Sequence, residues 1–246
     1  MNKYLRGALV GLFWLGVWQA LAALVRLPLL LPGPVETARA LARLAQTGDF
    51  WRTTGTTLLR VATGYTGAVL CGAVLAVLCA QWKGADALLS PLRTVIRATP
   101  VTSFIILVLL WIRRGWVPVF IAFLMVLPIV WTGVQDALNA VDGDLLEMAR
   151  MYGFSRWKTL RYVYAPSVRP AFLSASVTGL GFAWKSGIAA EVIALPAFAV
   201  GKSLNDAKVY LETADLFAWT LTVILLSLAL EKALKLWAKK AREGKA

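Results

Sequence analysis

The sequence contains no histidine, only two cysteines and few charged residues. Without histidine, the chain can form neither a Ser-His-Asp nor a Cys-His catalytic group, and it has no His-based metal site. Cys71 and Cys79 lie in one apolar stretch and are too few for a disulfide framework, so we expect them to be buried packing residues. Acidic residues are nearly absent from the long apolar stretches, which disfavours a membrane-bound enzyme. It also disfavours a stand-alone secondary transporter or channel, which remains the alternative class.

What the sequence has in abundance is apolar residues. They make up 59% of the 246 residues, with a mean hydropathy of +0.68, which is typical of an integral membrane protein. A helix needs about 20 mostly apolar residues to cross a bilayer. The stretches that predict such helices are 6–25, 56–80, 96–112, 117–136, 167–190 and 214–237. Pro100 interrupts the third, and no polar block between the stretches is long enough to fold separately. The sequence therefore predicts one all-α transmembrane domain over residues 1–246.

The formal net charge of +13 is explained by the membrane rather than by nucleic acid. Lys and Arg gather at the N-terminus, in the 137–166 loop and after residue 231, and loops rich in these residues stay in the cytoplasm. We predict that both termini and this loop are cytoplasmic, that the lipid bilayer is a partner and that nucleic acid is not. The stretch after Lys3 has the alternative interpretation of a cleaved signal peptide, although it is long for one. Residues 34–46 predict an amphipathic helix on the outer membrane surface.

Residues 142–166, within that loop, predict a helix-turn-helix on the inner face of the membrane. Asp144 is expected to cap the first helix, and Gly153 to reverse the chain in a left-handed backbone conformation. Ser155 is then expected to cap a second helix that Pro166 stops. The loop also carries apolar side chains that need a protein partner or the chain's own flank: Leu145, Met148, Met151, Tyr152 and Phe154.

The same loop resembles the EAA signature of binding-protein-dependent importer permeases. That signature reads Glu-Ala-Ala, three residues, Gly, nine residues, then Ile-x-Leu-Pro, and here it stands as Glu147-Met148-Ala149, Gly153 and Val163-Tyr164-Ala165-Pro166. The spacing is kept, with Met148 and Ala165 as apolar departures. Further elements similar to nitrate/sulfonate/taurine-type permeases are Leu-Pro-Gly-Pro at 31–34, Arg-Ala-Thr-Pro at 97–100 and Phe-Ala-Trp at 217–219.

The resemblance implies a pore-forming, non-catalytic permease subunit of an ATP-driven ABC importer in the bacterial cytoplasmic membrane. It implies the type I permease fold, with six transmembrane helices and a cytoplasmic coupling helix. The implied partners are a second permease copy in a homodimer, two cytoplasmic ABC ATPase subunits and an extracytoplasmic substrate-binding protein. This chain itself would hold no cofactor, and ATP-Mg would bind the ATPase. The implied substrate is a small anionic or organic solute such as a sulfonate, taurine or nitrate, with a thiamine-precursor-like heterocycle as the alternative. The residues implied to couple to the ATPase are Glu147, Met148, Ala149, Met151, Tyr152, Gly153, Phe154, Val163, Ala165 and Pro166.

A candidate translocation pathway follows the fifth predicted span. Ser174, Thr178, Gly181 and Lys185 fall on one helical face. Because a lysine inside the membrane is costly unless it faces water or a partner charge, Lys185 is the best single candidate for a pore residue. The alternative is that this face allows close helix packing and Lys185 snorkels outward. A second small-residue face, expected to serve packing, comprises Gly64, Ala68, Cys71 and Gly72.

Gly201-Lys202-Ser203 resembles the end of a phosphate-binding loop. The glycine that such a loop requires five residues earlier is Pro196 here, so the match fails. We expect no ATP site in this segment.

Overall fold

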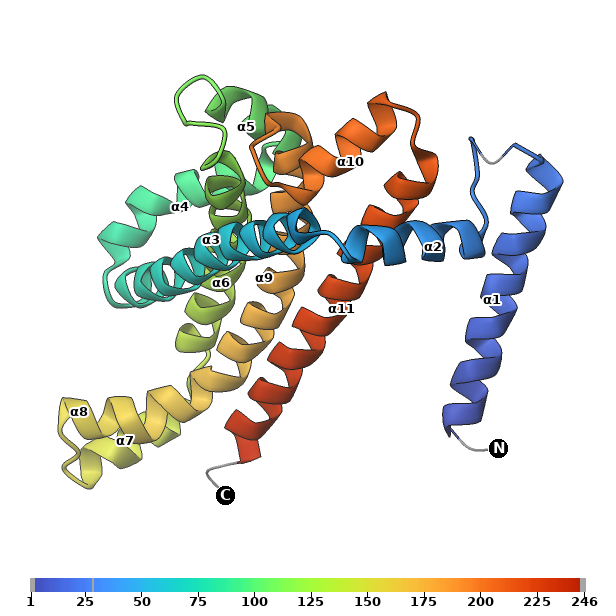
Figure 1. The fold of residues 1–246 in the computed structure, drawn as a ribbon. Helices are drawn as coiled ribbons and strands as arrows, with labels where there is room; N and C mark the ends of the chain where they lie inside the picture. The colour runs from blue at the N-terminus through green and yellow to red at the C-terminus, as the bar shows by residue number, and fades with distance from the viewer. Residues whose placement is uncertain (1–2, 28, 244–246) are drawn as a thin grey trace.

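The computed structural model describes the backbone of residues 3–27 and 29–243, and these residues form helices joined by short turns, with no strand among them (Figure 1). The all-α prediction is confirmed. The helices are α1 (Lys3–Val25), α2 (Pro34–Ala45), α3 (Gly48–Gln81), α4 (Lys83–Ala98), α5 (Val101–Val108), α6 (Val117–Asn139), α7 (Gly143–Met151), α8 (Arg156–Thr159), the π-helical turn η1 (Leu160–Tyr164), α9 (Ala165–Ala194), α10 (Val200–Val209) and α11 (Thr213–Glu243).

The core is a layer of three long helices, with α6 packed between α3 and α9. Trp131 of α6 is fully buried there. On α3, a Cβ atom added at Gly64 would lie 2.3 Å from the carbonyl oxygen of Val119, so only glycine permits this approach of the two backbones. Ala68 and Gly72 are buried on the same face. The predicted small-residue face therefore packs α3 on α6 within one chain.

Within residues 3–27 and 29–243, four helices are long and apolar enough to cross a membrane, namely α1, α3, α6 and α11, and the bent pair of α4 and α5 passes the same test when taken together. The helix α9 has 30 residues, but its Ser, Thr and Gly residues and Lys185 lower its hydropathy. The prediction of a third span at 96–112 is wrong as a single helix, because α4 and α5 meet there at a bend of 103°. Proline disfavours the helical conformation in the residue before it, and Thr99, which precedes Pro100, is extended with φ −81° and ψ 130°.

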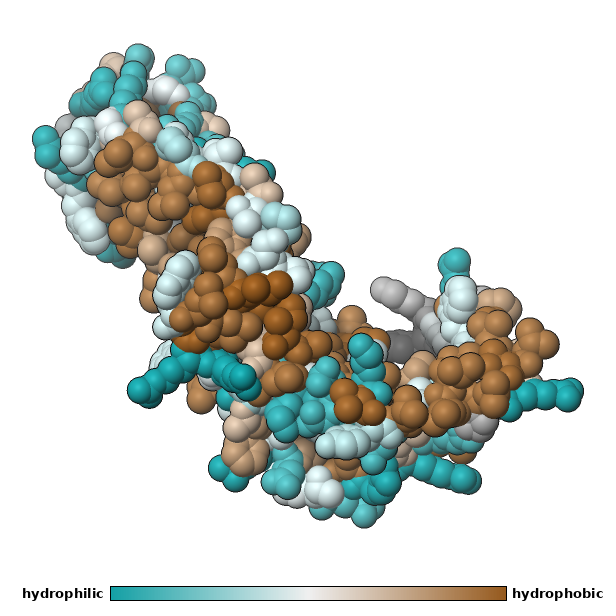
Figure 2. Space-filling model, turned by 90° about the horizontal axis from the view of Figure 1, so that it is seen from above, coloured by the Kyte–Doolittle hydropathy of each residue, from teal (hydrophilic) through white to brown (hydrophobic). Residues whose placement is uncertain are grey.

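The N-terminal helices lie at the edge of the molecule, on the side of α11 (Figure 1). The Trp18 ring stacks on Phe217 at 5.9 Å between centroids, and its Nε1 donates to the carbonyl oxygen of Pro32 at 3.1 Å. The predicted amphipathic helix at 34–46 is α2, which lies across α11, and an ion pair joins Arg43 to Asp215. Apolar side chains are exposed on α1 and elsewhere, and Figure 2 shows hydrophobic residues gathered over large parts of one face. Such surfaces suit lipid or a further protein subunit.

Candidate functional site

The first half of the predicted coupling segment is α7, and its start differs from the prediction. Asp142, not Asp144, is the capping residue: its carboxylate accepts a hydrogen bond from the backbone N–H of Asp144 at 2.9 Å. Asp144 lies in the first turn of the helix, where a negative charge is also favourable. The prediction failed by two residues because Asp142 and Asp144 both lie at the start of this helix and an acidic side chain at either position suits its positive end.

Gly153 ends α7 in the left-handed conformation that the sequence predicted, with φ +64°. The N–H of Gly153 donates to the carbonyl oxygen of Arg150 at 3.0 Å, and the N–H of Phe154 donates to that of Ala149 at 2.9 Å. These two bonds form a Schellman motif, which satisfies the last carbonyl groups of the helix. The turn is therefore defined by backbone geometry that glycine adopts without strain.

The second half runs without interruption into α9. Ser155 caps α8 as predicted, since its Oγ accepts from the backbone N–H of Lys158 at 3.3 Å. The prediction that Pro166 stops this helix is wrong. The chain passes through η1, where the N–H of Ala165 donates to the carbonyl oxygen of Leu160, five residues earlier. Pro166 then falls in the first turn of α9, where its missing N–H costs little. One continuous helical arm thus links the segment to α9.

The predicted coupling residues divide into an exposed and a packed group. Met151 is 87% exposed and Tyr152 77% exposed at the tip of the segment. The packed group comprises Ala149 and Val163, which are buried, and Phe154, whose ring lies 6.4 Å from that of Tyr162. The remaining predicted residues are all exposed: Glu147, Met148, Gly153, Ala165 and Pro166. The segment therefore presents apolar side chains outward at its tip while others anchor it.

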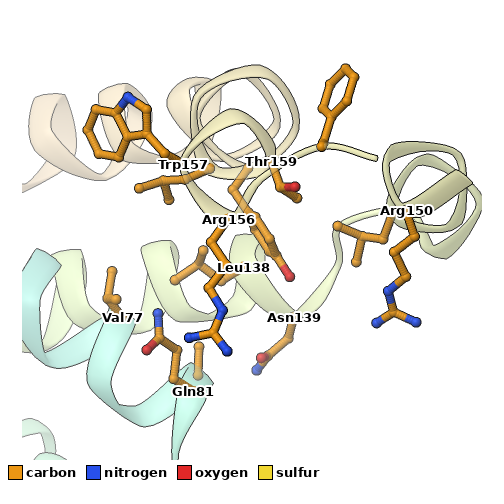
Figure 3. A pocket seen from close by; sticks show the side chains of 13 residues that line it. Val77, Gln81, Leu138, Asn139, Arg150, Arg156, Trp157 and Thr159 are labelled. Carbon is orange, nitrogen blue, oxygen red and sulfur yellow. The ribbon is translucent and has the colours of Figure 1, made fainter. Parts of the chain in front are cut away.

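A cavity of about 890 Å³ lies between this segment and the ends of α3 and α6 (Figure 3). Arg150 and Arg156 line it from the segment, and Gln81 and Asn139 line it from the two long helices. In Figure 3 the side chain of Arg156 points toward those of Gln81 and Asn139. The sequence does not predict this cavity, because its walls come from segments far apart in the chain.

A second cavity, of about 570 Å³, lies beside α9 at the bend between α4 and α5. Of the predicted pathway residues, Thr178 and Lys185 line it, together with Arg97 and Thr99 from the bend. Lys185 and Arg97 are both exposed, and neither side chain has an ion-pair or hydrogen-bond partner in the described part of the chain. The rest of the lining is mostly apolar: Ile96, Val101, Met125, Pro128, Ile129, Phe182, Ser186 and Ala189.

The other two predicted pathway residues lie outside this cavity. Ser174 lines a smaller hollow against α11, beside Lys235 and Lys239. Gly181 is half-buried and lines neither space. The predicted face is therefore shared between two hollows, with Thr178 lining both.

A buried carboxylate that sequence reasoning missed joins α3, α9 and α10. Glu191 is fully buried, and Thr57 donates to its two carboxylate oxygens at 3.0 and 2.9 Å. Arg60 pairs with it at 3.2 Å, and the backbone N–H of Gly201 donates at 3.1 Å. A Cβ atom at Gly201 would lie 2.5 Å from that of Glu191, so this glycine allows close packing of α10 on α9. The signal in the sequence was a pair of opposite charges, with Arg60 near the start of the 56–80 stretch and Glu191 directly after the 167–190 stretch.

No group of His, Cys, Asp or Glu side chains within residues 3–27 and 29–243 is arranged to hold a metal ion. Cys79 is buried and Cys71 half-buried, and both are free thiols.

Comparison with known proteins places these features in a family. The model of a family described as "binding-protein-dependent transport system inner membrane component" matches residues 68–242. The riboflavin transport system permease protein RibX of Chloroflexus aurantiacus is 30% identical, over 89% of this chain and 85% of that protein. The taurine transport system permease protein TauC of Escherichia coli is 25% identical, over 90% of this chain and 82% of that protein. The putative aliphatic sulfonates transport permease protein SsuC of Bacillus subtilis is 25% identical, over 87% of this chain and 78% of that protein.

A solved structure also shares the fold. The chain matches a crystal structure of an amino acid ABC transporter with histidines with a TM-score of 0.58 and 21% identity. The match covers 75% of this chain and 90% of that chain.

Proposed function

We propose that this chain forms the solute pathway of an ATP-driven importer and hydrolyses no ATP itself. It belongs to the family of binding-protein-dependent transport system inner membrane components, as an ABC importer permease of the nitrate/sulfonate/taurine type. The observation that carries the proposal is the segment 142–166, which has the EAA spacing, exposes Met151 and Tyr152 at its tip and continues without a break into α9. Exposed apolar side chains on a short loop suit a protein partner.

The segment acts as the coupling element. Met151 and Tyr152 insert into a groove of the ATPase, and Glu147 contributes charge at the same surface. When ATP binding closes the ATPases, α7 moves and the arm from α8 through η1 transmits the displacement to α9. Because α9 carries Lys185, the displacement changes access to the second cavity. Rigid helices joined by short turns are the elements through which such two-state changes travel.

The assembly comprises two copies of this chain, two cytoplasmic ATPase subunits that bind ATP-Mg and an extracytoplasmic binding protein. The exposed apolar surface supports burial against lipid and a second copy. Residues 1–246 form one domain, with both termini and the coupling segment on the cytoplasmic side. The distribution of Lys and Arg supports that orientation.

The solute is a small anion with an apolar portion. Lys185 and Arg97 supply two positive charges to one cavity whose lining includes no acidic residue, and a carboxylate or sulfonate binds such donors through charge-assisted hydrogen bonds. The relatives named for taurine and aliphatic sulfonates favour the same class. The second candidate is a heterocycle, which the 30% identity to a riboflavin transport permease favours.

Co-expression with the cognate ATPase tests the proposal. We expect a complex of two permeases and two ATPases by native mass measurement, with ATP hydrolysis only when the ATPase is present. Uptake of taurine and of riboflavin into proteoliposomes, each with its binding protein, then separates the two substrate classes. A monomeric chain that transports solute without an ATPase would contradict the proposal.

A further inference from the structure

The cavity between the coupling segment and the ends of α3 and α6 contains two arginines without an anionic partner. Arg150 and Arg156 line it and are exposed. Neither guanidinium forms an ion pair or hydrogen bond with another residue in the part of the chain that the structure describes. The amide side chains of Gln81 and Asn139 add further donors, and no carboxylate is among the lining residues. The polar wall of the cavity is therefore suited to an anion.

The cavity lies where a membrane-spanning helix meets water. Gln81 is the last residue of α3 and Asn139 the last of α6, and both helices are long and apolar enough to cross a bilayer. Lipid headgroups occupy this depth at each end of a span. The lining also includes Trp157 and Tyr164, and Trp and Tyr side chains are enriched at the headgroup level.

Apolar side chains also line the cavity, and they argue against a free inorganic anion. The apolar aliphatic side chains that line the cavity are Val77, Ala80, Leu138, Leu146 and Leu160. Val77 and Leu138 belong to the two spans, so this apolar lining continues toward the hydrocarbon layer. A free phosphate ion would use the arginines and leave this lining, and most of the 890 Å³, without a partner.

We propose that this cavity binds an anionic phospholipid by its phosphate group. Arg150 and Arg156 donate hydrogen bonds to the phosphate oxygens, Gln81 and Asn139 hydrogen-bond the glycerol region, and an acyl chain lies along the walls formed by α3 and α6. The lipid then bridges the coupling segment to the ends of two core helices. Met151 and Tyr152 do not line the cavity, so the lipid and the ATPase occupy different faces of the segment.

Lipid retention by the full-length chain in detergent tests this site. We expect native mass spectrometry to show phosphatidylglycerol binding about tenfold more tightly than phosphatidylcholine. Both lipids carry the same phosphodiester group, but Arg150 and Arg156 repel the quaternary ammonium group of choline. The double variant Arg150→Gln/Arg156→Gln is expected to lose that preference. Lys158→Gln is the matched control, because it removes a positive charge from the same helix at an exposed position outside the cavity.

A second measurement keeps the test independent of how the variants fold. The unaltered chain is expected to unfold at a higher temperature with phosphatidylglycerol than with phosphatidylcholine. Equal retention of the two lipids, or an unchanged preference in the double variant, would overturn the proposal. Displacement of phosphatidylglycerol by millimolar inorganic phosphate would assign the cavity to a free anion instead. Displacement by the purified ATPase would assign the arginines to the protein partner.

Discussion

At the scale of single residues, Gly153 determines the turn of the proposed coupling segment. A left-handed backbone costs a non-glycine residue about 1–2 kcal/mol, and a β-branched residue adopts it least readily. Gly153→Val is therefore expected to lower the population of the observed turn conformation, relative to other conformations, about 5–30-fold. The variant should insert in the membrane yet lose ATPase association or coupled uptake, as measured by pull-down and transport on the same membranes.

Gly143 provides the matched control for that substitution. It lies in the same segment, its φ is not in the left-handed region and a Cβ atom there meets nothing within 4 Å. Gly143→Val should bind the ATPase and support uptake at wild-type levels. If Gly153→Val did the same, the segment would not be the coupling element.

Lys185 and Arg97 are expected to act on the solute rather than on assembly. Replacing either with Met removes one of two positive charges from the cavity, so uptake of an anionic solute should fall about tenfold. ATPase association and basal hydrolysis should stay unchanged, and Lys208→Met, at an exposed position outside the cavity, should not affect uptake. Normal uptake by Lys185→Met would favour the snorkelling interpretation of this lysine.

Glu191 is expected to matter for stability. Glu191→Ala would leave the Arg60 guanidinium without its ion-pair partner and remove the acceptor for Thr57 and for the N–H of Gly201. Breaking a buried ion pair from one side costs about 3–5 kcal/mol, which denaturant unfolding in detergent can measure. The exposed Glu212 offers the control, since Glu212→Ala should change stability by less than about 0.5 kcal/mol. Equal stability of the two variants would contradict this role for Glu191.

Residues that the sequence predicts correctly interact with partners close to them in the chain, whereas the residues it misses interact with distant ones. Gly153 and Ser155 were predicted correctly because their partners lie within five residues. Glu191 was missed because Thr57 is 134 residues away and Arg60 is 131 residues away in the chain. Arg97 was predicted only as part of the Arg-Ala-Thr-Pro element, because its place beside Lys185 follows from the bend between α4 and α5 and from the packing of α9 next to that bend.

At the scale of elements, two prolines show the limits of a local rule. Pro100 breaks its helix as expected, since it extends Thr99 and separates α4 from α5. Pro166 does not, because η1 changes the hydrogen-bond register just before it and places it in the first turn of α9. Sequence pattern predicted the helical stretches well and their continuity poorly. The π-helical turn has no sequence signal that distinguishes it from an ordinary helix end.

The continuity of the arm from α8 to α9 leads to a prediction. Two glycines inserted after Tyr164 should make this junction flexible, since each glycine in a helix costs about 1 kcal/mol relative to alanine. We expect the complex to assemble and hydrolyse ATP while uptake is lost. The same insertion after Arg113, in the turn between α5 and α6, should leave uptake intact. Retained uptake with the first insertion would show that the arm does not transmit the displacement.

At the scale of the whole molecule, hydropathy indicates which stretches enter the membrane but not how they pack. The order of α3, α6 and α9 in the core depends on small residues such as Gly64, whose contact lies across the interface with α6. The exposed apolar side chains of α1 and the other outer helices are what a membrane and the proposed second copy would cover. The distribution of Lys and Arg predicts which side of the membrane each loop faces.

That orientation can be tested with cysteine labelling in a Cys71→Ala/Cys79→Ala background, since these are the only two native thiols. Arg114→Cys lies in the turn between α5 and α6 and Lys158→Cys lies in α8, and both positions are exposed. Because Lys- and Arg-rich loops are retained in the cytoplasm, a membrane-impermeant thiol reagent should label Arg114→Cys in spheroplasts. It should label Lys158→Cys only in inverted vesicles. The opposite pattern would place the coupling segment outside, where no ATP-driven partner could reach it, and would refute the coupling role.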